Sequence, residues 1–165
     1  MLSVVNNLRL LLLASWLGAA IFFSATVAPS AFHVSRAFNL PNAGEVAGAM
    51  VNRTLGVINI SGFVVSVLLL GLALVLKNNF RKPTFVLQLV LLLVVSVATA
   101  VGEWVIAAKM RALRTAMAIP IEQVSAGDPL RVAFQALHGY SVAALSVAII
   151  AGLIAFFVMA QRRHA

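Results

Sequence analysis

The stretch "VAFQALHGYSVAALSVAIIAGLIAFFVMAQ" (Val132–Gln161) holds 30 consecutive residues without Asp, Glu, Lys or Arg. A helix needs about 20 mostly apolar residues to cross the roughly 30 Å of hydrocarbon in a bilayer. This stretch therefore predicts a transmembrane helix. Outward from it, toward the N-terminus, three further runs of at least 20 uncharged residues occur at Pro83–Gly102, Thr54–Leu76 and Leu10–Phe32. The sequence thus predicts four membrane-spanning helices.

The composition supports a membrane protein and excludes several other classes. Hydrophobic residues make up 62% of the chain and charged residues only 10%, whereas soluble domains carry roughly 25% charged residues. The net charge of +8 comes from Lys and Arg at the ends of the runs, where they anchor to lipid headgroups, so nucleic-acid binding is not expected. The absence of cysteine excludes disulfides, thiolate metal sites and cysteine nucleophiles.

These observations predict an all-α integral membrane four-helix bundle with up-down-up-down topology. We expect one domain over residues 1–165, with spans at about 10–34, 43–76, 83–116 and 129–160. Helices two and three are expected to extend beyond the bilayer. Asn42 followed by Glu45 is typical of a capped start for helix two, and Asp128-Pro129 is typical of the start of helix four.

The distribution of charge bears on orientation. An even number of spans places both termini on one face. The Lys and Arg residues divide equally between that face (Arg9, Lys77, Arg81, Lys82, Arg162, Arg163) and the opposite face (Arg36, Arg53, Lys109, Arg111, Arg114, Arg131). All four acidic residues fall on the opposite face, and the connections on the termini face are short and densely basic. This pattern favours cytoplasmic termini in a bacterial inner membrane.

Polar residues gather toward the end of the bundle opposite the termini. In helix four, Arg131, Gln135 and His138 follow one another at helical spacing on one stripe. Ionisable groups at membrane depth are costly and face protein or water, so we expect one polar pocket at this end. Its predicted lining residues are His33, Arg36, Arg53, Asn59, Glu103, Arg111, Arg114, Gln135, His138 and Ser141.

The two histidines of this pocket allow two interpretations. His138 can make a polar contact between helices, and His33 can reach water near the interface. Alternatively, His33 and His138 together could ligate a b-type haem or copper. Glu103 is expected to form an ion pair with Arg53 or Arg111. No nucleophile or second carboxylate accompanies Glu103, so we expect no enzymatic activity.

Four stretches, in chain order, resemble the four-helix membrane domain of unknown function that includes transmembrane protein 205. "WLGAAIFFSATVAPSAF" is similar to the first-helix pattern of that family, and "NAGEVAGAM", "KMRALRTAM" and "FQALHGYSVAAL" are similar to later segments. The matching positions are Trp16, Gly18, Phe22, Ala28, Pro29, Phe32, Ala43, Gly44, Arg111, Arg114, Phe134, Leu137, His138 and Ser141. The entry to helix two departs from the family, with Arg53 and Asn59 where aromatic residues are usual.

The resemblance implies a compact four-helix membrane protein without an established enzymatic activity. We therefore expect a non-enzymatic accessory subunit or a stress- or export-related factor, without a cofactor. Its expected partners are the lipid bilayer and either a larger membrane complex or further copies of this chain. Two alternatives remain open, namely a redox subunit that holds haem or copper and an oligomeric transporter of small solutes.

Overall fold

The computed structural model describes residues 2–40, 42–77 and 82–161. Within these residues the chain is entirely helical apart from its connections and contains no strand. The helices form four long, continuous rods. The first and the third rod each consist of two α-helices joined by a π-helical segment. The segments are α1 (Leu2–Phe22), η1 (Phe23–Val27) and α2 (Ala28–Ala37); α3 (Ala43–Val75); α4 (Lys82–Ala100), η3 (Val101–Ala107) and α5 (Ala108–Ala116); and α6 (Pro129–Ala160).

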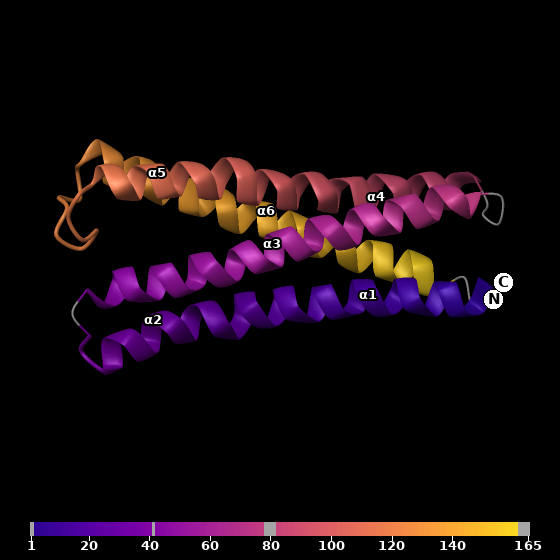
Figure 1. Ribbon diagram of the computed structural model, residues 1–165, viewed down its shortest axis with the longest axis horizontal. Coiled ribbons are helices and arrows are strands. Elements are labelled where there is room, and N and C mark those ends of the chain that lie inside the picture. Colours follow the sequence, from indigo (N-terminus) through magenta and orange to yellow (C-terminus); the bar gives the residue numbers. More distant parts are fainter. Residues whose placement is uncertain (1, 41, 78–81, 162–165) are drawn as a thin grey trace.

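The rods run antiparallel in sequence order and form the predicted four-helix bundle (Figure 1). α1 packs against α3 and α6, and α4 packs against the same two helices. α1 begins and α6 ends at the same end of the bundle (Figure 1). At the other end, called here the distal end, α2 packs against α3 and α5 packs against α6. These two pairs of helices diverge toward the distal end (Figure 1).

All four rods are long and apolar enough to cross a membrane, which confirms the predicted class. They contain between 32 and 35 residues each, and 32 residues of α-helix are about 48 Å long. The hydrocarbon layer is roughly 30 Å thick. Every rod therefore extends beyond the bilayer by several turns, and not only helices two and three as the sequence predicted.

Among the described residues, leucine is the most frequent in the core, and small residues of α6 and one tryptophan also belong to it. Ala148, Ala151 and Ala155 of α6 are buried. Within lipid, helices associate through close packing rather than hydrophobic transfer, so small residues at the contacts are favourable. Trp16 is buried, and its Nε1 donates a hydrogen bond to the backbone oxygen of Ile58, at 3.0 Å. This bond ties α1 to α3 at mid-bundle.

Two of the rods contain a π-helical segment. In the first rod, η1 precedes Pro29, which has no backbone N–H and whose ring excludes the carbonyl of residue i−4. The Ala28 N–H consequently bonds to the Phe23 oxygen, five residues back. The second segment, η3, contains no proline. It contains Glu103, and π-helical turns are frequent at functional sites.

The helix starts follow the sequence predictions only in part. Asp128 caps α6 as predicted, since its Oδ1 accepts a hydrogen bond from the Leu130 N–H at 2.8 Å. α3 begins at Ala43, but Asn42 adopts a left-handed conformation and its side chain makes no capping bond. Instead, Glu122 from the connection between α5 and α6 accepts a hydrogen bond from the Gly44 N–H at 2.6 Å. The cap of α3 thus comes from a distant part of the chain.

Candidate functional site

The distal end contains one buried carboxylate, Glu103, on the π-helical segment η3. Its Oε1 accepts a hydrogen bond from Arg111 Nη1 at 3.2 Å, and the two groups form an ion pair. Its Oε2 is buried and has no hydrogen-bond partner among the described residues. A buried carboxylate is stable only when it is paired and hydrogen-bonded. Glu103 is therefore only half satisfied by the protein.

Two glycines create the space for this carboxylate and for a neighbouring amide. A Cβ atom on Gly56 of α3 would lie 3.3 Å from Glu103 Oε2. A Cβ atom on Gly102 would lie 3.1 Å from Nδ2 of Asn59, which is also buried. Each helix thus places a polar side chain over a glycine of the other. This reciprocal contact brings α3 and η3 together at the start of the distal end.

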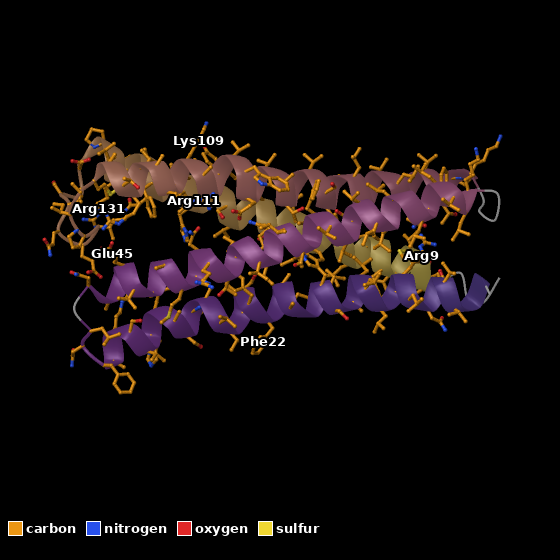
Figure 2. All side chains as sticks on the ribbon, in the orientation of Figure 1. Arg9, Phe22, Glu45, Lys109, Arg111 and Arg131 are labelled. Atoms are coloured by element: carbon orange, nitrogen blue, oxygen red, sulfur yellow. The ribbon has the colours of Figure 1, made fainter. Side chains whose placement is uncertain are left out.

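Arg111 connects the buried carboxylate to the surface. Its side chain is 51% exposed, whereas that of Glu103 is 11% exposed. In Figure 2, Arg111 points from α5 toward α3, and Lys109 on the same helix points away from the bundle. A guanidinium carries five N–H donors, so pairing with Glu103 leaves several of them for another group.

A second set of polar contacts lies beyond Glu103 and Arg111, nearer the tip of the distal end. Arg114 of α5 forms an ion pair with Glu45 of α3. Arg131 donates to the backbone oxygen of Val124, which holds the connection between α5 and α6 against α6. The Arg114–Glu45 pair and the hydrogen bond from the Gly44 N–H to Glu122 join the two diverging helix pairs at the distal end.

The predicted pocket residues do not all converge. Glu103, Arg111 and Asn59 lie at the contact of η3 and α5 with α3, and the predicted ion pair of Glu103 is formed by Arg111. Arg114 is partly buried in its pair with Glu45, and Ser141 is buried on α6. The remaining five, His33, Arg36, Arg53, Gln135 and His138, are exposed.

The prediction that His138 faces the neighbouring helices is therefore wrong. The uncharged run of 30 residues is longer than the roughly 20 needed to cross the hydrocarbon. The part of α6 that carries His138 can consequently lie outside the hydrocarbon, where an exposed imidazole is inexpensive. A haem or copper site between His33 and His138 would need both imidazoles to face one interior, and both are exposed on separate helices.

Sequence reasoning missed two buried polar residues near the other end. Arg9 of α1, expected to reach the headgroups, is 1% exposed and points into the bundle (Figure 2). Gln88 of α4 is fully buried, and neither of its amide atoms has a partner among the described residues. Gln88 is the only amide within the apolar run Pro83–Gly102. This isolated polar side chain was the signal in the sequence that could have predicted its burial. Of the other anchors expected on that face, Arg81, Arg162 and Arg163 lie outside the described residues.

A separate groove of about 600 Å³ runs between the first rod and α3. Most of its lining is apolar, including Val27, Ala31 and Val34 on one side and Met50 and Val51 on the other. None of the predicted pocket residues lines it. Among the described residues, no group of three or more His, Asp or Glu side chains is placed to hold a metal ion.

Comparisons with known proteins identify a family without giving it a function. No curated protein and no solved structure matches the chain. Residues 11–118 match the family described as a domain of unknown function, DUF4149. The match covers more than half of the chain and includes Glu103, Arg111, Asn59 and both glycines that face them. This multi-pass membrane protein belongs to the DUF4149 family.

Proposed function

We propose that this protein is a non-enzymatic membrane protein that binds a polar ligand or partner at Glu103 and Arg111. In this proposal it acts as an accessory subunit or as a stress- or export-related factor. The observation that carries the proposal is the buried Oε2 of Glu103, which has no partner among the described residues. An unsatisfied buried carboxylate oxygen is costly, and a ligand that donates a hydrogen bond to it would remove that cost.

The exposure of Arg111 supports a binding role. Half of the Arg111 side chain is accessible, so a ligand can reach its guanidinium while the guanidinium remains paired with Glu103. Glu103 pairs with a cation and not with a second carboxylate or a nucleophile, which favours binding over catalysis. We propose that the site binds its ligand without a cofactor.

We also propose a location and partners for the protein. We place the protein in a bacterial inner membrane with cytoplasmic termini, on the basis of the basic connections on that face. The bilayer is one partner, and a larger membrane complex or further copies of the chain are the others; nucleic acid is not among them. We also propose kinship with transmembrane protein 205, which the motifs around Trp16, Pro29 and His138 support.

Native mass spectrometry of the full chain, extracted in mild detergent, tests the binding role. The wild-type protein is expected to carry a non-covalent adduct, and Glu103→Gln and Arg111→Gln are expected to lose most of it. Lys109→Gln is the matched control, because Lys109 is exposed on the same helix and points away from the site (Figure 2). A wild-type protein without adduct, or an adduct that survives both substitutions, would contradict the proposal.

A further inference from the structure

We infer that the ligand of the Glu103–Arg111 site is a headgroup that carries a primary ammonium next to a phosphate, as in a phosphoethanolamine lipid. This inference rests on the proposed function and gives the chemical class of its ligand. It follows from the depth of the site in the bilayer, from the two charges that the site presents, and from the excess of basic residues around it.

The site lies where lipid headgroups lie. Glu103 is 21 residues after Lys82, the first residue of α4, and 21 residues of helix rise about 31 Å. Gly56, which faces Glu103, is 19 residues before Val75, the last residue of α3, or about 29 Å. Both distances equal the thickness of the hydrocarbon layer. With the basic start of α4 at one surface, Glu103 and Gly56 therefore lie at the opposite surface.

The site offers one anionic group and one cationic group to a ligand. Glu103 has an oxygen without a partner among the described residues, and an ammonium supplies N–H donors for it. Arg111 is half exposed and retains donors that fit a phosphate. A zwitterion of this kind can replace the internal pair by two pairs, with its ammonium at Glu103 and its phosphate at Arg111. The charge of the buried carboxylate then remains compensated throughout.

The surroundings favour a ligand that includes an anion. The distal end has six basic residues and four acidic residues, namely Arg36, Arg53, Lys109, Arg111, Arg114 and Arg131 against Glu45, Glu103, Glu122 and Asp128. Two of the four acids, Glu45 and Glu103, are paired with arginines. A simple amine would therefore meet net repulsion, whereas a phosphate attached to the amine would be attracted.

This arrangement predicts selectivity among lipids. A choline headgroup has a quaternary ammonium without N–H donors, so it cannot hydrogen-bond to Glu103. A glycerol headgroup has hydroxyl donors for Glu103 but no cation, so its phosphate would bring an uncompensated negative charge close to a buried carboxylate. A phosphoethanolamine headgroup satisfies both Glu103 and Arg111.

Titration of the purified full chain in detergent with short-chain phosphatidylethanolamine, phosphatidylcholine and phosphatidylglycerol tests the inference. The ethanolamine lipid is expected to bind at least about tenfold more tightly than the other two, because it alone places a cation with N–H donors at Glu103 and a phosphate at Arg111. Glu103→Gln and Arg111→Gln are each expected to lower its affinity about tenfold, and Lys109→Gln to leave it unchanged. Soluble phosphoethanolamine, measured in parallel, distinguishes a free headgroup from a lipid as the source.

Further outcomes separate this inference from the proposed function. Equal binding of the three lipids, together with an adduct that still depends on Glu103 in native mass spectrometry, would overturn the lipid class and leave the binding role intact. If Glu103→Gln fails to fold by circular dichroism, Gly56→Ala provides a second variant, because its Cβ would press on Oε2 without changing any charge. Unchanged affinity in Gly56→Ala would then contradict the inference.

Discussion

At the scale of single residues, glycine decides how closely the helices approach. A Cβ atom on Gly62 of α3 would lie 2.6 Å from Trp16 Nε1 and 2.9 Å from Thr99 Cγ2. Three rods meet at this point, since Trp16, Gly62 and Thr99 come from α1, α3 and α4. The hydrogen bond from Trp16 to the Ile58 oxygen depends on the same approach. The packing around Trp16 therefore requires a residue without a side chain at position 62.

Gly62→Ala is expected to destabilise the protein by about 1–3 kcal/mol, the usual cost of adding a methyl group to a filled core. The control is Gly71→Ala on the same helix, where the added Cβ would have no neighbour within 4 Å beyond the adjacent backbone of its own helix. That control should keep or raise stability, because alanine favours a helix by up to about 1 kcal/mol over glycine. Denaturation in detergent, followed by circular dichroism, measures both. Equal stability of the two variants would show that α1 and α3 are not packed as described.

For His138, in contrast to Gly62, we expect substitution to have little effect on stability. Its side chain is exposed, so His138→Leu should change the stability by no more than about 0.5 kcal/mol, the range of most surface substitutions. Buried Ser141 lies less than one turn further along the same helix. Ser141→Leu should destabilise by about 1–3 kcal/mol through overpacking. Thermal denaturation of the two variants compares them directly, and a large loss in His138→Leu would mean that its imidazole has a partner.

At the scale of elements, the start of α3 is stabilised by a residue 78 positions away in the chain. Glu122 accepts a hydrogen bond from the Gly44 N–H, one of the first N–H groups of α3, which have no partner within the helix. A carboxylate at this position also interacts favourably with the helix dipole. Local sequence predicted Asn42 as the cap, because a capping pattern contains no information about residues that approach from another helix connection.

Glu122→Ala should therefore loosen the first turn of α3. A lost helix cap costs about 1 kcal/mol, which corresponds to roughly a fivefold rise in amide hydrogen exchange if the turn opens locally. Gln123→Ala is the matched control, since Gln123 is exposed and adjacent. Hydrogen–deuterium exchange of the peptide containing Gly44 measures the effect. Faster exchange in both variants would implicate the connection as a whole, and no change in either would contradict the cap.

At the scale of the whole molecule, hydropathy predicts the number and class of the helices but not which side chains are buried. Four uncharged runs of at least 20 residues have few alternatives in a bilayer, because only helices and closed barrels satisfy the backbone there. The burial of Arg9 and Gln88 depends on the rotation of each helix against its neighbours. For the candidate site, the sequence predicted an ion pair of Glu103 with Arg53 or Arg111, and only the structure selects Arg111. The sequence did not predict the glycines that make room for the carboxylate, since their role appears only when α3 meets η3.

The arrangement of the whole chain in the membrane is testable because the protein contains no cysteine, so single cysteines can report on accessibility. Ser125, in the connection between α5 and α6, and Lys77, after α3, are exposed at opposite ends of the bundle. With cytoplasmic termini, a membrane-impermeant maleimide should label Ser125→Cys in intact bacterial cells and Lys77→Cys only after permeabilisation. Ser15→Cys is the control, since Ser15 is exposed in the middle of α1, where we expect hydrocarbon to surround it, and it should resist labelling in both conditions. Reversed labelling would overturn the orientation alone, whereas labelling of Ser125→Cys and Lys77→Cys from the same side would overturn the up-down-up-down bundle itself.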